Sequence, residues 1–416
     1  MRNIAIIGAG QSGLLLGIGL VDRGYRVTLV SDRTPEQIRQ GPVPAGAMVF
    51  HDALEIERAM GLSLWDDVAV MVERAHIDVA APDGTVALSI DARLDNPGLC
   101  IDQRLKSALW IEAFVRRGGR FVVKPATVSD LETYAREHDL VVVAAGRGEI
   151  SHLFPRDAAR SPFEAAARHV SMVVIRGIPE RAGVKLDGVR FRILPQVGEI
   201  FSAPIYTKDL FQGLFLGYEA IPFGPMDRIV RGMPPEAQLS LSKEVFRDLV
   251  PWEYEAIRDA ELADDQACLV GTIVPTVRRP YGVLPSGAVV MGIADTVNLH
   301  DPMAAQGANS AAKMALLVRE RIVQHGDRPF DAEWMQAVFE EAWVYLQHCN
   351  LLGQTLLLPP EPHVMEILGA AAHNPIIASR LVNGFNHPPS LFPWLADPAE
   401  AQRFLASAVL KAKVQR

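Results

Sequence analysis

The sequence has little of what marks disulfide-stabilised, membrane-spanning or nucleic-acid-binding proteins. Its 416 residues include only three cysteines, Cys100, Cys268 and Cys349, without CxxC spacing, so neither a disulfide framework nor a thiolate metal site is indicated. No uncharged apolar run reaches about 18 residues, and the apolar N-terminal stretch leads into a glycine motif, so neither a membrane span nor a signal peptide is expected. A net charge of −8, with no basic block longer than Arg116-Arg117, argues against nucleic acid as a partner.

What is present is typical of a globular protein. Hydrophobic residues make up 49% and charged residues 22% of the sequence, which predicts a packed core throughout. The length allows two or three structural regions. We expect a soluble, cytoplasmic protein, for which a homodimer is one candidate assembly.

The chain begins with the pattern of a dinucleotide-binding unit. An apolar run at residues 3–7 ends at Gly8-Ala9-Gly10-Gln11-Ser12-Gly13, a helical pattern follows as far as Gly24, and a second apolar run covers residues 27–30. Gly8 permits a tight turn, Gly10 lets the backbone approach a pyrophosphate, and Gly13 lets helix and strand pack closely. The helix N-terminus offers free N–H groups to the phosphates. The residues from Gly8 to Gly13, including Gln11 and Ser12, are therefore cofactor-binding candidates.

The residues that would hold the adenosine ribose follow the second apolar run. An acidic residue normally closes this strand, about 20 residues after the glycines. Here Ser31 stands at that place and Asp32 follows, so Ser31, Asp32 or both are candidates. Arg33 fits either the 2′-phosphate of NADP or a solvated ion pair with Asp32, and therefore does not choose the nucleotide.

A second motif far along the chain favours FAD. An apolar strand at residues 288–294 ends at Asp295, and a Pro-containing loop leads into Gln306-Gly307-Ala308-Asn309 and a helical pattern from residue 310 to 321. Asp295 can accept a hydrogen bond from a ribityl hydroxyl while the helix N-terminus faces the flavin. NAD would not require this second element. Pro302, Gln306, Gly307 and Asn309 join the cofactor-binding candidates.

These motifs carry a resemblance to a known family. Gly292-x-x-Asp295, Asp301-Pro302 and Gln306 to Asn309 resemble the second FAD signature of flavoprotein aromatic monooxygenases. Within them the chain is most similar to the oxygenase component of styrene and indole monooxygenases. The likeness spans nearly the whole chain, through residues 8–13, 31–33, 139–146, 161–164, 273–275, 295–309, 358–361 and 383–386.

The resemblance implies an α/β fold like that of p-hydroxybenzoate hydroxylase. It contains a Rossmann-like FAD-binding domain of the GR2 type, an inserted β-sheet substrate domain and C-terminal helices. We assign residues 1–60, 95–165 and 270–330 to the discontinuous FAD-binding domain, and residues 61–94 and 166–269 to the substrate domain. Residues 331–416 form the helical region, in which residues 331–358 are expected to be one long helix.

One departure from related enzymes concerns the source of electrons. Single-component aromatic hydroxylases carry an Asp-Gly motif, linked in that family to FAD and NADPH binding, where this chain has Ala145-Gly146. No second strand-linked GxGxxG is present to bind NAD(P). We therefore expect reduced FAD to arrive from a separate NAD(P)H:flavin reductase. Arg104, Ala145 and Gly146 complete the cofactor-binding candidates.

The resemblance also implies a mechanism. FADH2 would react with O2 to a C4a-hydroperoxide, which passes one oxygen atom to a styrene-like or indole-like aromatic alkene and gives an epoxide. Such chemistry needs a positioned substrate and exclusion of water more than acid–base side chains. The alternatives are a single-component NAD(P)H-dependent hydroxylase or flavin oxidase and, outside enzymes, a flavin-fold binding protein. The six tryptophans are never two apart, so the Trp-x-Trp pair of flavin halogenases is absent.

The substrate prediction is weakened by residues 41–50. The styrene enzymes have a stretch like Arg-Leu-x-Asn-Thr beside the flavin, whereas this chain has small or apolar residues there, before His51. No residue is assigned a certain catalytic role. The candidates near the flavin are Val43, Gly46, Met48, His51 and Pro302.

No metal is expected. The eleven histidines show no helix-face pair such as HExxH, and an oxygenase metal needs two histidines and a carboxylate on one ion. His51, His76 and His300 are interpreted as polar or core residues, with a role at the flavin site as the alternative.

Overall fold

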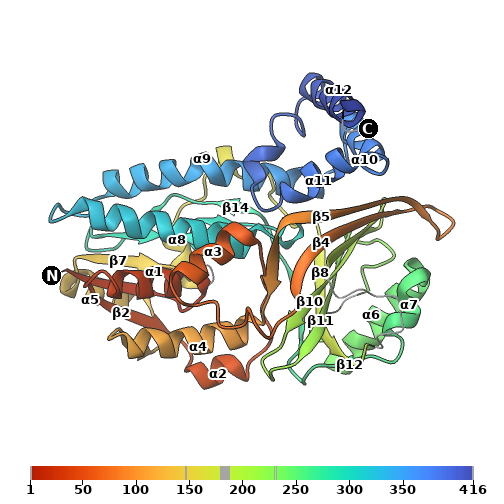
Figure 1. The fold of residues 1–416 in the computed structure, drawn as a ribbon. Coiled ribbons are helices and arrows are strands. Elements are labelled where there is room, and N and C mark those ends of the chain that lie inside the picture. Colours follow the sequence, from red (N-terminus) through yellow and green to blue (C-terminus); the bar gives the residue numbers. More distant parts are fainter. Residues whose placement is uncertain (1, 146–147, 179–187, 229, 231, 415–416) are drawn as a thin grey trace.

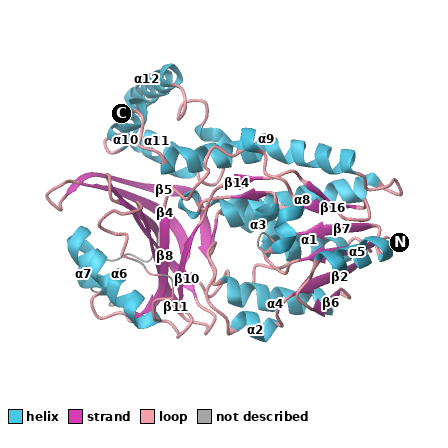
Figure 2. Cartoon of the chain, turned by 180° about the vertical axis from the view of Figure 1, so that it is seen from behind, coloured by secondary structure: helices cyan, strands magenta, loops and turns pink. Residues whose placement is uncertain are grey.

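The structure, a computed structural model, has two halves built on separate β-sheets (Figure 1). It describes residues 2–145, 148–178, 188–228, 230 and 232–414. One half holds both the N-terminus and a sheet flanked by helices α1, α4, α5 and α8, and the other is a larger sheet with α6 and α7 on its outer side. The helices from α9 onward run along one side of both halves, and this arrangement is also seen from behind in Figure 2. An α/β fold with C-terminal helices is confirmed.

The smaller sheet has six strands in the order β15-β16-β7-β1-β2-β6, all parallel except the pair β15 and β16. Its strands are β1 (Asn3–Ile7), β2 (Arg26–Ser31), β6 (Arg120–Val123), β7 (Leu140–Val143), β15 (Tyr281–Val283) and β16 (Val289–Gly292). The predicted strands at the two ends of the nucleotide motif and before Asp295 are confirmed. Strand β1 has β2 on one side and β7 on the other, so the order of the strands reverses direction at β1. Open α/β sheets bind ligands at the carboxyl ends of strands at such a point.

Helices cover both faces of this sheet because its parallel strands are apolar on both sides. Helices α1 (Gln11–Val21), α4 (Gln103–Arg116), α5 (Val128–Glu137) and α8 (Gln306–His325) flank the sheet, whereas α2 (Pro35–Arg39) packs on α4 and α3 (His51–Ala59) packs on α8. Every residue of α1 except Val21 is buried, since this helix is packed between the sheet, α4 and α8. A helix that is apolar nearly all round fits that position.

The larger sheet has the order β12-β8-β11-β10-β9-β4-β5-β3, with β13 also paired to β8. Its strands are β3 (Met48–Val49), β4 (Met71–Ala80), β5 (Val86–Cys100), β8 (His169–Arg176), β9 (Gly188–Leu194), β10 (Gly198–Tyr206), β11 (Gln212–Ala220), β12 (Glu261–Leu262) and β13 (Cys268–Thr272). Both β3 and the end of β5 pair in this sheet, although residues 1–60 and 95–165 were assigned to the other domain. The division into domains stays a prediction, with these residues at its border.

The two faces of the larger sheet have different neighbours. Alternate residues such as Val173, Ile200 and Leu216 pack against α6 (Pro235–Leu249) and α7 (Pro251–Ile257). Because side chains alternate along a strand, the residues between them face the other half of the molecule. That second face is therefore available to form a wall between the two halves.

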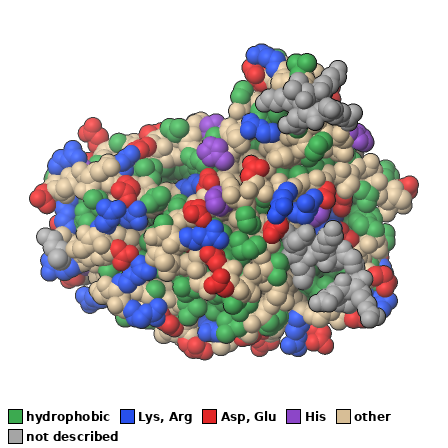
Figure 3. Space-filling model, viewed as in Figure 1, with side chains coloured by type: hydrophobic (Ala, Val, Ile, Leu, Met, Phe, Trp, Pro, Cys, Tyr) green, Lys and Arg blue, Asp and Glu red, His purple; other side chains and the backbone are tan. Residues whose placement is uncertain are grey.

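The C-terminal region is helical, as the sequence predicts. Its helices are α9 (Ala332–Leu357), α10 (Pro362–Ala371), α11 (Pro375–Asn383) and α12 (Pro398–Val414). The long α9 packs on α8, and α11 packs on β5, so this region contacts both halves. Within the described ranges, no helix combines the length and apolarity needed to cross a membrane. On the face drawn in Figure 3, basic side chains are interspersed with acidic ones.

A buried ion pair connects α3 and α4 beneath α1. The Lys106 ammonium lies 2.8 and 3.0 Å from the two carboxylate oxygens of Glu57, and each side chain is only 1% exposed. Burial raises the pKa of Glu57, and the attraction to Lys106 opposes that shift. Gln11, in the nucleotide motif, also donates to Glu57, at 3.3 Å. The ion pair therefore lies directly under the start of α1.

Removing one partner of this ion pair should destabilise the protein more than removing both. We expect Lys106→Met to lower the free energy of unfolding by about 3–5 kcal/mol, because Glu57 is left buried without a cation. The double variant Lys106→Met, Glu57→Met should recover most of this loss. Thermal unfolding of the wild type, Lys106→Met, Glu57→Met and the double variant measures the effect. A double variant as unstable as Lys106→Met would contradict it.

Candidate active site

One cavity of about 440 Å³ lies between the two halves and collects most of the motif residues found in the sequence. Its lining includes the start of α1, the end of β2, residues 42 and 44–48, and parts of the segment from Ala294 to Ala311. These stretches are far apart in the sequence. They meet here because the carboxyl ends of β1 and β2 open toward the larger sheet.

The glycine motif has the geometry that its spacing predicts. Gly8 has φ +117°, and a Cβ there would lie 2.8 Å from the carbonyl oxygen of Ala144. A Cβ on Gly13 would lie 2.0 Å from the carbonyl oxygen of Gly8, whereas a Cβ on Gly10 would meet nothing within 4 Å. Gly8 and Gly13 thus allow backbone segments to approach one another. Gly10 instead leaves open space in the cavity.

The N-terminus of α1 has no side-chain cap. Gly10 is the N-cap residue, and no side-chain oxygen accepts a hydrogen bond from the first turn. The free N–H groups and the positive end of the helix dipole therefore face the cavity at Gly10, Gln11 and Ser12. An anionic group is the natural partner of such a site.

The predicted ribose residues lie together at the edge of the cavity. Ser31 is the last residue of β2, and Ser31, Asp32 and Arg33 all contribute to the lining. The Ser31 hydroxyl accepts a hydrogen bond from the Arg33 N–H at 3.3 Å. The Arg33 and Asp32 side chains lie 3.5 Å apart and are 47% and 64% exposed, so their ion pair is weak. All three stay candidates for the adenosine end.

Arg104 lines the cavity, and its guanidinium is held by protein groups. It contacts both carboxylate oxygens of Asp102, both of Asp264, and the carbonyl oxygen of Gly41. Burial alone would lower the pKa of Arg104, but the hydrogen bonds that it donates to the two aspartates raise it. Arg104 thereby joins the start of α4, the loop at residue 41 and the segment before β13. A direct contact with a cofactor stays a prediction.

The second motif forms the opposite end of the cavity. Asp295 lies in a 3-10 turn, Ala294–Thr296, and Pro302 begins another, Pro302–Ala304. Helix α8 then starts after Ala305, which lies in the left-handed region with φ +52°. No side chain caps the N-terminus of this helix. Asp295, Pro302 and Gly307 line the cavity. A second uncapped helix N-terminus therefore faces the same space.

Gln306 and Asn309 do not line the cavity. The Gln306 amide donates to the carbonyls of Ala304 and Phe385, and Asn309 bridges the Phe50 N–H and the carbonyls of Met48 and Ala305. Their side chains thus fix the loops around the start of α8. As cofactor contacts they stay predictions.

The remaining candidates divide in the same way. Gly46 and Met48 line the cavity, whereas Val43 and His51 do not. Ala144 is in the lining rather than Ala145, and Gly146 lies outside the described residues. His76 lies on β4 beside Asp91 and away from the cavity.

His300 is the histidine that reaches the cavity. It is buried, and its Nε2 lies 3.0 Å from both the Asn298 amide nitrogen and the Ser310 hydroxyl. Burial lowers the pKa of His300 to about 4. It is therefore neutral at pH 7 and links β17 (Asn298–Leu299) to α8.

The wall formed by the larger sheet was missed from the sequence. Seven apolar residues of β8 to β11 line the cavity: Val170, Met172, Val189, Phe191, Phe201, Ala203 and Phe215. They lie on the face opposite α6 and α7. Phe201 has room because its cross-strand partner is Gly217, where a Cβ would lie 2.3 Å from the Phe201 ring. The alternation of these residues along the strands was the available signal.

A chain of polar side chains supports the cavity from below. The Gln103 side-chain amide donates to the side-chain amide oxygen of Gln11 at 3.1 Å and to the backbone carbonyl of Gly46 at 2.9 Å. Gln11 in turn donates to Glu57 and to the backbone carbonyl of Ala308. These bonds connect the first motif, the loop at residue 46 and the start of α8. The positions of both uncapped helix ends are therefore coupled through Gln11.

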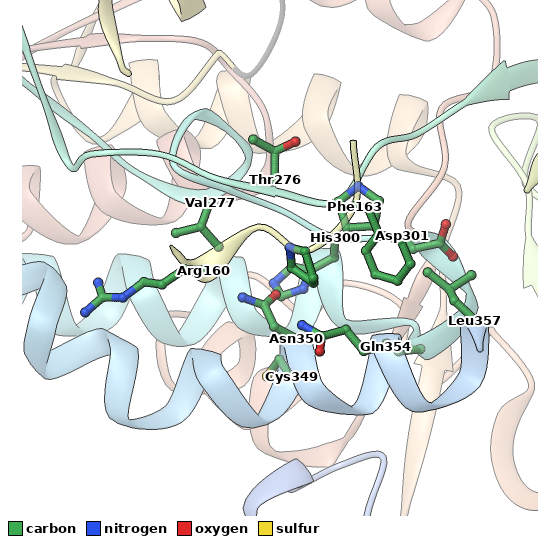
Figure 4. A pocket seen from close by; sticks show the side chains of 14 residues that line it. Arg160, Phe163, Thr276, Val277, His300, Asp301, Cys349, Asn350, Gln354 and Leu357 are labelled. Carbon is green, nitrogen blue, oxygen red and sulfur yellow. The ribbon is translucent and has the colours of Figure 1, made fainter. Parts of the chain in front are cut away.

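A second, smaller cavity lies behind the loop at residue 301 (Figure 4). Its volume is about 20 Å³, and its lining includes His300, Asp301, Asn350 and Gln354. His300 and Asp301 line both cavities. This loop therefore forms part of the partition between the two spaces.

The sequence of the larger-sheet half matches a known protein family. A family model described as "Styrene monooxygenase A putative substrate binding domain" matches residues 146–256. Two curated relatives are the styrene monooxygenases StyA of Pseudomonas fluorescens and of a Pseudomonas species. Each is 26% identical over 400 residues, which is 93% of this chain and 93% of the relative.

Solved structures share the fold at lower sequence identity. The flavin-dependent brominase Bmp2 matches with a TM-score of 0.64 and 13% identity, with 100% of both chains covered. The 2-methyl-3-hydroxypyridine-5-carboxylic acid oxygenase matches with a TM-score of 0.62 and 16% identity over 91% of this chain and 96% of that one. At such identities the likeness shows the fold alone.

These findings confirm the resemblance drawn from the sequence. The similarity to styrene monooxygenases extends along nearly the whole chain, and the matched family domain contains the apolar strands that line the cavity. By this similarity, the chain is a flavin-dependent monooxygenase that resembles the oxygenase component of styrene monooxygenases.

Proposed function

We propose that the chain is the FADH2-dependent oxygenase component of a two-component system, and that it epoxidises a styrene-like or indole-like aromatic alkene. One observation carries the proposal. A single cavity joins the dinucleotide motif, the uncapped start of α8 and an apolar wall of the larger sheet. Such a space suits a long cofactor at one end and an apolar substrate at the other.

The cavity offers FAD a partner for each of its parts. The first turn of α1 suits the pyrophosphate, because its free N–H groups and the space at Gly10 allow close approach. Ser31 and Asp32 suit the adenosine ribose, and Asp295 suits the ribityl chain. The uncapped start of α8 favours negative charge, and a reduced flavin anion carries negative charge on its ring system. Bound FAD would supply the two electrons and the oxygen-activating chemistry.

The protein itself would position the substrate and exclude water from the cavity. Pro302 and Met303 line the cavity just before the start of α8, and we place the meeting point of the substrate and the flavin ring there. The wall residues from β8 to β11 exclude water from one side. Exclusion of water protects a reactive oxygen species from loss as peroxide.

The substrate class follows from the side chains on the wall. The lining from β8 to β11 consists of apolar and aromatic residues, with Ser202 as its polar member. No Lys or Arg of these described strands lines the cavity to pair with a substrate carboxylate. A small, uncharged aromatic compound fits best. The relatives are named styrene monooxygenases, which supports an aromatic alkene.

Paired glycine variants test the FAD site. We expect Gly10→Ala to fold like the wild type but to bind FAD at least about tenfold more weakly, because its Cβ fills the approach to the pyrophosphate. Gly13→Ala makes the same chemical change where its Cβ would lie 2.0 Å from the Gly8 carbonyl oxygen, so the loss should be in folding. Flavin titration by fluorescence and thermal unfolding separate the two effects. Unchanged FAD affinity in Gly10→Ala would contradict the proposed site.

An aromatic wall residue tests the substrate site. Phe201→Ala should raise KM for styrene about tenfold or more while kcat changes less, because it removes contact made equally before and during reaction. Phe223→Ala is the matched control, since Phe223 is 99% exposed and away from the cavity. Steady-state epoxide formation with a supplied flavin reductase measures both. Equal KM values in the two variants would count against this wall as the substrate site.

The source of electrons can be tested directly. We expect the purified chain with FAD to oxidise NADH and NADPH no faster than free FAD does. Adding an NADH:flavin reductase should start consumption of O2 and formation of a product heavier by one oxygen atom. Rapid NADH oxidation by the chain alone would favour the single-component alternative and would contradict the interpretation of Ala145.

A further inference from the structure

Four ionisable side chains meet at the border between the apolar wall and the loop at residue 301. Glu199 of β10 and Glu219 of β11 are directly opposed on adjacent antiparallel strands. Arg168 precedes β8, and Asp301 precedes Pro302. All four are buried or nearly so, with relative exposures of 0% for Glu219 and 3% for Asp301.

Arg168, the one cation among these four side chains, is paired with the carboxylate of Glu199. Arg168 donates to both oxygens of Glu199, at 2.9 and 3.1 Å, and its remaining nitrogen donates to the carbonyl of Ala167. Glu199 and Arg168 therefore form a closed pair with no net charge. Glu219 and Asp301 are left without a cation of their own.

A shared proton would satisfy the carboxyl groups of Glu219 and Asp301 together. Among the described residues, no N–H or O–H group donates to either oxygen of Glu219, and a neighbouring side chain that interacts with it electrostatically is the Asp301 carboxyl. Asp301 accepts one hydrogen bond, from the Met303 N–H at 3.0 Å. Two carboxylates in contact inside a protein cannot both be ionised, and a hydrogen bond between them requires that one carries a proton.

Burial reinforces this arrangement. It raises the pKa of Glu219 well above its usual range, and the neighbouring charges of Asp301 and Glu199 add to that shift, while Arg168 opposes it. Burial also raises the pKa of Asp301, and its hydrogen bond from Met303 works against the change. The adjacent His300 is neutral and brings no charge to the pair.

We propose that Glu219 and Asp301 hold one shared proton at the wall of the active-site cavity, and that Asp301 delivers it during turnover to the oxygen atom that leaves as water. The proposal rests on the monooxygenase function proposed above. Asp301 is the member that lines the cavity, so it makes the transfer. Glu219 is a positioning residue that keeps the proton in place.

The proton balance of monooxygenation gives this pair a role. The O–O bond of O2 breaks, one oxygen atom bonds to the substrate, and the other becomes water. Two electrons and one proton come from the reduced flavin anion as it is oxidised, so the second proton of the water must come from elsewhere. The carboxyl pair supplies it and then regains a proton from solvent.

The small cavity of Figure 4 provides a route by which a proton from solvent can replace the one that Asp301 has delivered. Its volume of about 20 Å³ is enough for one water molecule. Asp301 lines it together with Asn350 and Gln354, which are half-buried on α9. A water there would lie between Asp301 and polar groups near the surface.

Infrared spectroscopy of the FAD-free protein tests the shared proton without relying on turnover. At neutral pH we expect a C=O band of a protonated carboxyl that shifts in D2O and is lost in both Glu219→Gln and Asp301→Asn. Glu261→Gln is the control, because Glu261 is 70% exposed and paired with Arg176, and the band should survive. A wild type without this band, or a band that persists in both variants of the pair, would overturn the proposal.

Stability against pH is an independent measurement. The folded protein holds a proton on Glu219 that the unfolded chain releases in the ordinary carboxyl range, so stability should fall as pH rises above that range. Glu219→Gln mimics the protonated form and should lose this pH dependence above the ordinary carboxyl range. Glu199→Gln, which leaves Arg168 unpaired, should instead be destabilised throughout. A Glu219→Gln protein with the same pH dependence as the wild type would count against the shared proton.

Turnover then tests the delivery. With a supplied reductase, Glu219→Gln should release a larger share of the consumed O2 as hydrogen peroxide and lose the pH dependence of its product yield, while its FAD affinity stays unchanged. Unaltered product yield and pH profile would overturn the delivery step. If the wild type oxygenates no aromatic alkene, the proposed function fails, while the infrared result still decides whether the proton is shared.

Discussion

The contact between the backbones of Gly8 and Gly13 determines where the active site can be. Because no side chain separates them, α1 begins directly at the carboxyl end of β1. Its uncapped N-terminus then opens into the space between the two sheets. If this approach were blocked, the helix would have to move away from the strand, and the first turn would no longer face Asp295 and the start of α8.

The larger sheet uses its two faces for different purposes. One face packs against α6 and α7 and completes a core, and the other presents apolar side chains to the cavity. Strand alternation makes this division possible with a single layer of strands. The same rule puts Glu199 and Glu219 side by side at the edge of the apolar face. The apolar wall and the opposed side chains of Glu199 and Glu219 therefore arise from one register.

Polar contacts hold the cavity together rather than filling it. Gln11 and Gln103 connect the two helix starts, and Arg104 joins α4 to the segment before β13. Such bonds satisfy buried polar groups that would otherwise cost about 1–3 kcal/mol each. The residues that line the open space are accordingly small or apolar at many positions, which leaves room for a cofactor and an aromatic substrate.

Local patterns in the sequence predicted the parts that depend on neighbouring residues. The strand–glycine–helix unit, the strand before Asp295, the helix after Gln306 and the long helix from residue 331 are all present. Each follows from periodicity and from glycine at fixed spacing. The roles suggested for Gln306 and Asn309 stay predictions, because a motif gives a residue's place on the chain but not the direction of its side chain.

By itself, the sequence determined the dinucleotide-binding start, the second motif and the resemblance to styrene and indole monooxygenases, since these depend on short runs of residues. Only the tertiary structure decided which face of the larger sheet meets the cavity, that Arg104 is held by Asp102 and Asp264, and that Glu219 meets Asp301. Glu219 and Asp301 lie on different elements and far apart in the sequence. Their meeting depends on how the two halves pack, which no local pattern records.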